Sequence, residues 1–141
     1  MGLSRLAEFD TKTANALARR TRFQMNPDRT AILINHENDL YHCRLDGTST
    51  MRLTHSDASE NYATFSPSGQ AIAFVREGNL YVVDLTDQKE RALTSDGGGL
   101  ILNGEADWVY YEEVLNRAAP AMFWWSPDSQ SLAFMLSLIH I

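Results

Sequence analysis

The sequence has few of the features that mark disulfide-bonded, membrane-spanning or nucleic-acid-binding proteins. Its single cysteine, Cys43, excludes an internal disulfide. Because Cys43 lies in a strand-like run of apolar residues, we expect a buried, inert thiol rather than a reactive one. No apolar run approaches the roughly 18 residues that a transmembrane helix needs. The formal net charge is −6 and no block of Lys or Arg occurs, so nucleic acid is excluded as an expected partner.

Catalytic and metal-binding motifs are missing as well. No Gly-x-Ser-x-Gly nucleophile elbow occurs, and nothing marks a Ser-His-Asp triad. The glycine-rich run at 96–99 is not followed by the Lys-Ser/Thr pair of a phosphate-binding loop. The histidines lack the spacing of metal ligands; they are His36, His42, His55 and His140. We therefore expect no catalytic residue, metal or cofactor in this sequence.

The sequence does contain a repeat in which equivalent residues lie 40 positions apart without a gap. The first copy supplies Pro27, Ala31, Ile32, Leu40, Tyr41, Leu45, Leu53 and Thr54. The second copy supplies Pro67, Ala71, Ile72, Leu80, Tyr81, Leu85, Leu93 and Thr94. A third copy opens at Trp125-Ser126-Pro127-Asp128 and continues through Leu132-Ala133-Phe134, but its proline lies 60 positions after Pro67.

Each copy predicts short strands separated by Pro- and Gly-containing turns. In the second copy the strands are expected at 62–65, 71–75, 79–85 and 90–93, and in the first at 31–34, 40–45 and 51–54. A four-stranded unit of about 40 residues is typical of a β-propeller blade, which buries its faces only between neighbouring blades. We predict an all-β fold and a partial β-propeller over residues 1–135: two full blades (about 23–57 and 62–96), a helical insertion (97–121) and another blade from 122.

The two ends of the chain follow the repeat less clearly. Leu6–Asp10 resembles the end of an earlier blade, and a helix over 13–20 is the competing interpretation. The last six residues, 136–141, resemble the translation of a sequencing-library adapter, so we treat them as an expected artefact. The start lacks the apolar core of a signal peptide, and we expect the true N-terminus to lie upstream. The compartment stays open, and a periplasmic or secreted location would suit a bacterial source.

The insertion that interrupts the repeat carries two adjacent carboxylates, Glu112 and Glu113. Residues 107–115 predict a helix of about two turns with Asp107 as its N-cap. Neighbouring side chains on a helix point about 100° apart, yet two carboxylates can still converge on one small cation. A primary ammonium, with three donors, suits that position. From the residues alone, an ordinary solvated pair stays open as the alternative.

Residues 101–114, with the string Asp-Trp-Val-Tyr-Tyr-Glu-Glu-Val, and residues 123–129, Phe-Trp-Trp-Ser-Pro-Asp-Ser, closely resemble the dipeptidyl peptidase IV branch of the prolyl oligopeptidase family of serine peptidases. The resemblance covers roughly residues 24–135. In that family an eight-bladed propeller caps an α/β-hydrolase domain. A pair of glutamates grips the substrate's N-terminal ammonium, and the catalytic serine cuts after the second residue, usually Pro or Ala.

By this resemblance, Glu112 and Glu113 bind the substrate amine, and the candidate supporting residues are Asp107, Trp108, Tyr110 and Arg117. Tyr111 stands where the family often has a third acid. The loop at 35–39 lacks the arginine that the family often uses for the substrate's carbonyl. Trp108, Trp124 and Trp125 are predicted to be packing residues rather than a binding cage.

The resemblance implies that the parent protein is a serine dipeptidyl peptidase and that this stretch alone is inactive. The implied partners are a peptide with a free N-terminus, the hydrolase domain of the same chain and, as an option, a second copy in a homodimer. One alternative is a non-catalytic propeller that binds proteins. Another is an endopeptidase of the prolyl oligopeptidase type, which would not be expected to carry the glutamate pair.

Overall fold

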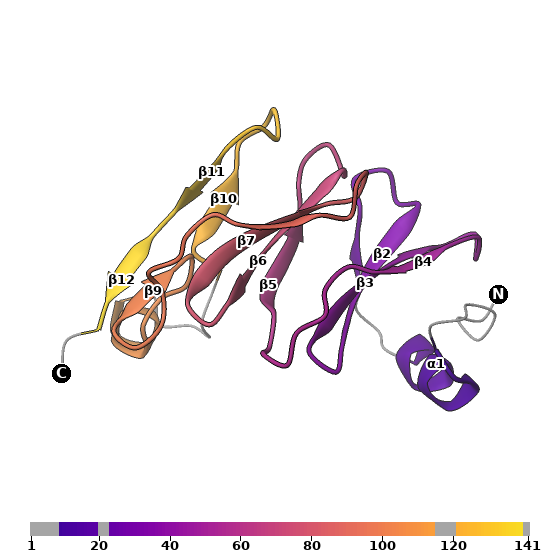
Figure 1. Ribbon diagram of the computed structural model, residues 1–141, viewed down its shortest axis with the longest axis horizontal. Helices are drawn as coiled ribbons and strands as arrows, with labels where there is room; N and C mark the ends of the chain where they lie inside the picture. The colour runs from indigo at the N-terminus through magenta and orange to yellow at the C-terminus, as the bar shows by residue number, and fades with distance from the viewer. Residues whose placement is uncertain (1–8, 20–22, 115–120, 140–141) are drawn as a thin grey trace. The chain divides into compact units, whose positions relative to one another are not determined.

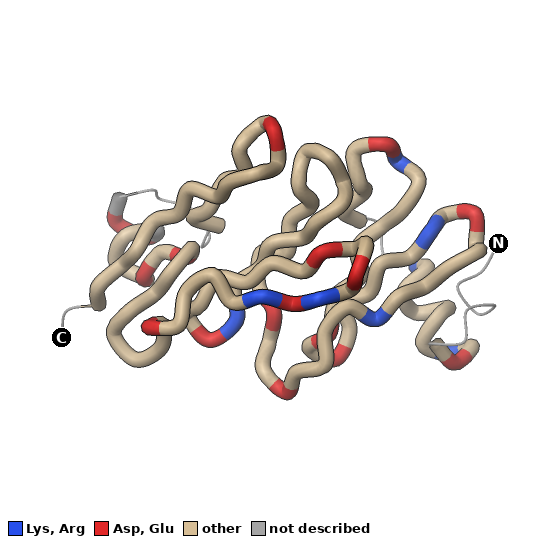
Figure 2. Tube along the Cα trace, turned by 45° about the horizontal axis from the view of Figure 1, so that its top comes forward, with Lys and Arg blue, Asp and Glu red and all other residues tan. Residues whose placement is uncertain are grey.

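The computed structural model describes residues 9–19, 23–114 and 121–139, and every strand pairing among them is antiparallel (Figure 1). The chain divides into two compact units, Met1–Asp57 and Ala58–Ile141. No helix in the described ranges is long and apolar enough to span a membrane. Charged residues of both signs are interspersed along the trace (Figure 2).

The first unit is a four-stranded sheet in the order β1-β2-β3-β4, accompanied by one helix. The strands are β1 (Gln24–Met25), β2 (Ala31–His36), β3 (Asp39–Arg44) and β4 (Thr50–Arg52). Helix α1 (Thr11–Ala18) begins at Asp10, whose Oδ1 accepts a hydrogen bond from the Thr13 amide at 2.8 Å. Leu17 of the helix packs in one apolar core with Ile32 and Cys43 of the sheet.

Helix α1 confirms one of the two interpretations of the N-terminal segment. Asp10 is a helix cap, and the helix predicted over 13–20 is confirmed two residues earlier than expected; that 6–10 ends an earlier blade stays a prediction. The physical reason is that an aspartate at the N-cap satisfies an amide that the helix itself leaves unpaired. Residues 6–8 of that prediction lie outside the described residues.

The second unit contains another four-stranded sheet, in the order β5-β6-β7-β8, and two two-stranded sheets, β10-β11 and β9-β12. The strands are β5 (Asn61–Phe65), β6 (Ala71–Arg76), β7 (Asn79–Asp84), β8 (Glu90–Ala92), β9 (Ile101–Asn103), β10 (Phe123–Trp125), β11 (Leu132–Phe134) and β12 (Leu136–Leu138). Phe123 of β10 joins Val75, Leu80 and Val82 in the apolar core of this unit.

Equivalent residues of the sequence repeat make equivalent contacts. The Leu40 amide donates to the Thr54 hydroxyl at 2.8 Å, and the Leu80 amide donates to the Thr94 hydroxyl at 2.9 Å. The first turn of each copy has one residue with positive φ: Arg29 at 56°, Gly69 at 74° and Ser129 at 62°. The predicted strands are confirmed, with ends that differ from the expected ones by at most two residues.

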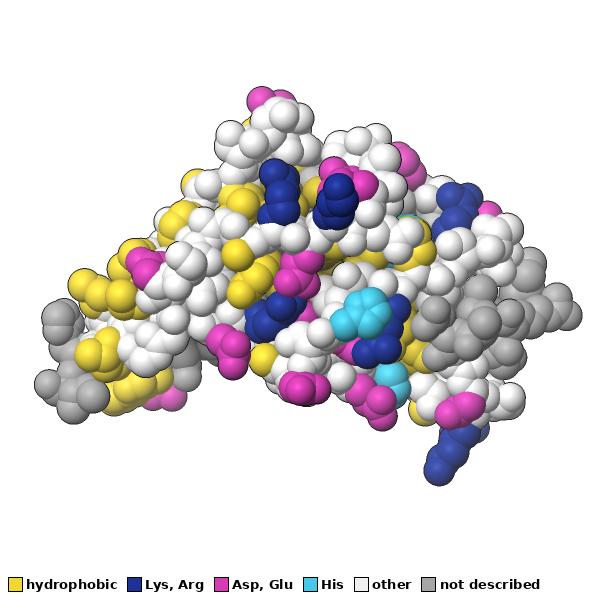
Figure 3. All heavy atoms as spheres, viewed as in Figure 1, with side chains coloured by type: hydrophobic (Ala, Val, Ile, Leu, Met, Phe, Trp, Pro, Cys, Tyr) yellow, Lys and Arg dark blue, Asp and Glu magenta, His cyan; other side chains and the backbone are white. Residues whose placement is uncertain are grey.

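The C-terminal residues that were set aside as an adapter include a strand. Residues 136–138 form β12, which pairs with β9 in the register Leu136↔Asn103, Ser137↔Leu102 and Leu138↔Ile101. Leu136 and Leu138 are exposed, and apolar side chains gather over β9, β11 and β12 (Figure 3). The adapter origin of 136–141 stays a prediction, since a short apolar segment can extend a sheet whatever its source.

Candidate functional site

The two glutamates lie in the segment between β9 and β10, residues 105–121, within the second unit. We call it the glutamate loop. Glu105 and Ala121 form an antiparallel bridge at its base. Next to this bridge, on the side of the sheets, the Met122 amide donates to the Gly104 carbonyl at 2.9 Å, and the Gly104 amide donates to the Met135 carbonyl at 2.9 Å. This neck of paired backbone fixes where the loop starts and ends.

Gly104, at the neck, requires the absence of a side chain. Its φ is +80°, a conformation that residues with a Cβ rarely adopt. A Cβ at this position would lie 3.2 Å from Val75 Cγ2 and 3.4 Å from both Leu80 Cδ1 and Phe123 Cδ1. The neck therefore sits directly on the apolar core of the unit.

A second set of contacts joins the start of the insertion to the β6–β7 turn. The Asn103 amide donates to the Gly78 carbonyl at 2.9 Å, and the Gly97 amide donates to Asn79 Oδ1 at 2.8 Å. The buried Asn103 side chain also donates to Asp96 Oδ1 at 2.9 Å. A Cβ at Gly97 would overlap the carbonyl group of Gly78. We call this backbone-to-backbone contact the glycine seam.

The loop begins with the helical turn that the sequence predicts. Asp107 Oδ1 accepts a hydrogen bond from the Tyr110 amide at 3.0 Å, which confirms its predicted role as N-cap. Helical backbone starts at Trp108 and continues as the π-helix η2 (Tyr110–Val114), so the turn around the glutamates is wider than the expected α-helix. π-Turns interrupt α-helices rarely, and often at functional sites.

Both carboxylates face solvent in this structure. Glu112 and Glu113 are exposed, and so are Trp108 and Val109, at 57% and 45%. Asp107 and Tyr110 are half-buried. Arg117, the remaining supporting candidate, lies outside the described residues.

The predicted packing role of the tryptophans holds for one of the three. Trp125 is half-buried against the core, and its Nε1 donates to the Thr64 carbonyl at 3.4 Å. Trp108 and Trp124 are 57% and 54% exposed in the described part of the chain, so the prediction is wrong for them there. Strand or helix position alone does not reveal which neighbours a side chain will meet. Cys43 is buried as predicted, and burial raises the pKa of its thiol.

Sequence reasoning missed Glu105 at the neck. The residue is half-buried, and this burial raises the pKa of its carboxyl above the ordinary value. The available signal was its position immediately after Gly104, at the point where the chain must enter the loop.

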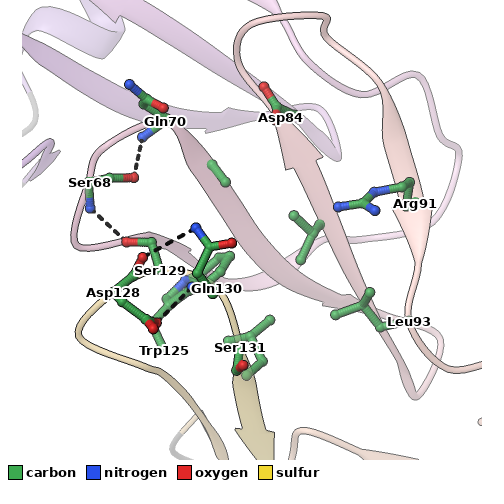
Figure 4. Close-up of a pocket in the computed structure, with 13 residues that line it drawn as sticks. Ser68, Gln70, Asp84, Arg91, Leu93, Trp125, Asp128, Ser129, Gln130 and Ser131 are labelled. Atoms are coloured by element: carbon green, nitrogen blue, oxygen red, sulfur yellow. Dashed lines mark hydrogen bonds between the residues drawn. The ribbon is translucent and has the colours of Figure 1, made fainter.

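A separate cavity of about 330 Å³ lies between the β5–β8 sheet and the β10–β11 hairpin (Figure 4). It is lined by Arg91, Asp84, Leu93 and Trp125 among others, and none of the predicted site residues borders it. The Ser68 amide donates to Ser129 Oγ at 2.9 Å across its rim. Within the described residues, β11 pairs only with β10, whereas its equivalent in the second copy, β6, pairs with β5 and β7.

Within the described ranges, no three His, Cys, Asp or Glu side chains come together in a way that could hold a metal ion. The half-buried and exposed acids of the glutamate loop instead leave a negatively charged, solvent-accessible surface beside two apolar side chains. Such a surface can accept hydrogen bonds from a cationic group.

Several known proteins are similar to this chain. It is 42% identical over 73 residues to the protein named "Probable dipeptidyl-aminopeptidase B" of Arthroderma gypseum, covering 52% of this chain and 8% of that protein. It is 47% identical over 75 residues to "Probable dipeptidyl peptidase 4" of Aspergillus clavatus, covering 52% and 9%. The crystal structure of Porphyromonas gingivalis dipeptidyl peptidase 4 superposes with a TM-score of 0.70 at 25% identity, over 96% of this chain and 20% of that one.

The chain thus spans under a tenth of the length of these two curated relatives. The family described as the Dipeptidyl peptidase IV (DPP IV) N-terminal region matches residues 48–137, a range that includes the second sheet, the neck and the glutamate loop. With most of its length matched, this chain belongs to the dipeptidyl peptidase IV N-terminal region family.

Proposed function

We propose that the complete protein carrying this sequence is a serine exopeptidase that releases N-terminal dipeptides with Pro or Ala in second position. In this proposal Glu112 and Glu113 bind the substrate's free N-terminal ammonium. The observation that carries it is the family match over 48–137, which contains both glutamates, on a loop anchored at its neck. The catalytic triad would come from an α/β-hydrolase domain elsewhere in the same protein.

The physical role of the pair is to set the register of cleavage. Two carboxylates offer acceptors for the three N–H donors of an ammonium, and each charge-assisted hydrogen bond is worth roughly 1.5–3 kcal/mol. A substrate held by its N-terminus presents its second peptide bond at a fixed distance from the clamp. A misplacement of about 1 Å at the reacting atoms can cost on the order of a hundredfold in rate, so the anchoring of the loop matters as much as its charge.

The test is a pair of isosteric substitutions, Glu112→Gln and Glu113→Gln, in the complete protein, with Glu77→Gln as the control. Glu77 is also exposed but lies in the β6–β7 turn, outside the loop. Each loop variant should lose about tenfold to a hundredfold in kcat/KM on a Gly-Pro chromogenic substrate, and Glu77→Gln should be unchanged. An N-acetylated substrate should be cleaved poorly, and activity should fall as the substrate amine (pKa about 7.7–8.0) deprotonates.

If both loop variants kept wild-type kcat/KM on the free-amine substrate, the amine-binding assignment would be wrong. The glutamates would then be an ordinary solvated pair.

A further inference from the structure

Trp108 is a large aromatic side chain left 57% exposed at the start of the glutamate loop. An indole exposed to this extent has a ring face that a cationic ligand can contact. The backbone beneath it is held, because Asp107 caps the turn through the Tyr110 amide at 3.0 Å. Trp108 is therefore presented to solvent by an ordered turn.

The exposed residues of the turn form one stripe. Trp108 and Val109 are exposed, Tyr110 is half-buried, and Glu112 and Glu113 are exposed again. This period of four residues is that of one helix face. The face that carries the carboxylates is thus the face that carries the indole.

The π-helix makes this juxtaposition specific. In an α-helix the residue one turn after position 108 would be Glu112, at i+4. In a π-helix the hydrogen bond closes at i+5, and the backbone from Tyr110 to Val114 has this wider turn. One full turn after Trp108 therefore ends between Glu112 and Glu113. The indole is thus expected on the helix face that lies between the two carboxylates.

We propose that Trp108 is a third residue of the amine-binding site: its ring face contacts the ammonium that Glu112 and Glu113 bind. This inference rests on the proposed function. A cation within about 6 Å of an indole face is attracted by the ring quadrupole, most strongly where water is excluded. The ring also shields one side of the ammonium from water, which strengthens both carboxylate contacts.

The experiment compares Trp108→Phe with Trp108→Leu in the complete protein. Phenylalanine keeps an aromatic face, whereas leucine keeps apolar bulk without one. Trp108→Leu should lower kcat/KM on a Gly-Pro chromogenic substrate about five- to thirtyfold, chiefly through KM, and Trp108→Phe should stay within about threefold of wild type. Trp124→Leu is the matched control, since Trp124 is 54% exposed but lies in β10, outside the loop; its kcat/KM should not change.

A second measurement separates an amine contact from a structural role. Loss of the ring should weaken the preference for the charged amine, so the high-pH limb of the kcat profile should move to lower pH in Trp108→Leu and not in Trp124→Leu. The midpoint of thermal unfolding should be unchanged in both Trp108 variants, because the side chain is exposed.

Three outcomes are decisive. Equal losses in the Phe and Leu variants would mean that an aromatic face is not sufficient at this position and would overturn the cation–π contact. Wild-type kinetics in Trp108→Leu, together with losses in the Glu→Gln variants, would overturn this inference and leave the proposed function standing. Wild-type kinetics in the Glu→Gln variants would remove the proposed function and, with it, this role for Trp108.

Discussion

Gly97→Ala should move the glutamate loop without touching any residue in it. The new Cβ would overlap the Gly78 carbonyl, which is backbone and cannot rotate away, so the glycine seam has to open. This opening should weaken or break two hydrogen bonds: the one from the Gly97 amide to Asn79 Oδ1, at 2.8 Å, and the one from the Asn103 amide to the Gly78 carbonyl, at 2.9 Å. At about 0.5–1.5 kcal/mol net for each bond, the local cost is about 1–3 kcal/mol.

Gly99→Ala is the matched control. Gly99 has φ of +59° and nothing within 4 Å of a built Cβ, so alanine there carries backbone strain of about 1–2 kcal/mol and no overlap. The two variants therefore lie two residues apart in the same glycine-rich turn before β9, one with a clash and one with strain alone.

The assay is hydrogen exchange of peptides spanning 96–105, with kcat/KM on a Gly-Pro substrate, in the complete protein. Gly97→Ala should speed exchange at the Asn103 amide by about five- to a hundredfold, in line with the 1–3 kcal/mol cost. If Glu112 and Glu113 bind the substrate amine as proposed, it should also lower kcat/KM by up to about a hundredfold, because the two carboxylates would be misplaced. Gly99→Ala should leave both quantities near wild type. Identical exchange and kinetics in the two variants would refute the idea that the seam positions the loop.

Three further expectations can be checked. Gly104→Ala, which combines positive φ with contacts at 3.2–3.4 Å, should lower the stability of the complete protein by about 2–5 kcal/mol in urea unfolding; no loss would mean that the core around Gly104 accommodates the added methyl group. Glu105→Gln should raise the unfolding temperature at pH 7–8. Burial raises the pKa of Glu105 above its ordinary value of 4.5, so the wild type has its full stability below pH 4.5 and loses part of it as the carboxyl ionises at higher pH. An advantage of the variant that persists at pH 3 would contradict this. The isolated 141-residue chain should not cleave a Gly-Pro substrate and should self-associate in size-exclusion chromatography, given its exposed Trp124, Phe134 and Leu138; an active monomer would show both expectations wrong.

The strands of the repeat could be predicted closely because the turns between them carry local signals. Pro27, Pro67 and Pro127 each open a turn whose third residue has positive φ, and such turns fix where strands start. The N-cap at Asp107 was readable for the same reason, since capping depends on residues three positions apart.

Features that depend on distant partners could not be predicted in this way. The pairing of β9 with β12 joins segments about thirty-five residues apart that share no repeat position. The exposure of Trp108 and Trp124 depends on which neighbours cover them, and the widening of η2 depends on the whole turn. The role of the glutamates is likewise not a property of their spacing, because adjacent acids on a helix are usually solvated.

The neck at Glu105 and Ala121 also determines how freely this region can vary in length. The strand before it, β9, pairs with β12, and the strand after it, β10, pairs with β11. Residues added between 105 and 121 should therefore leave both pairings in register. A doubling of a closed loop costs only about 0.6 kcal/mol in chain entropy. The segment from 105 to 121 should therefore tolerate insertions without a change in the strand pairings on either side of it.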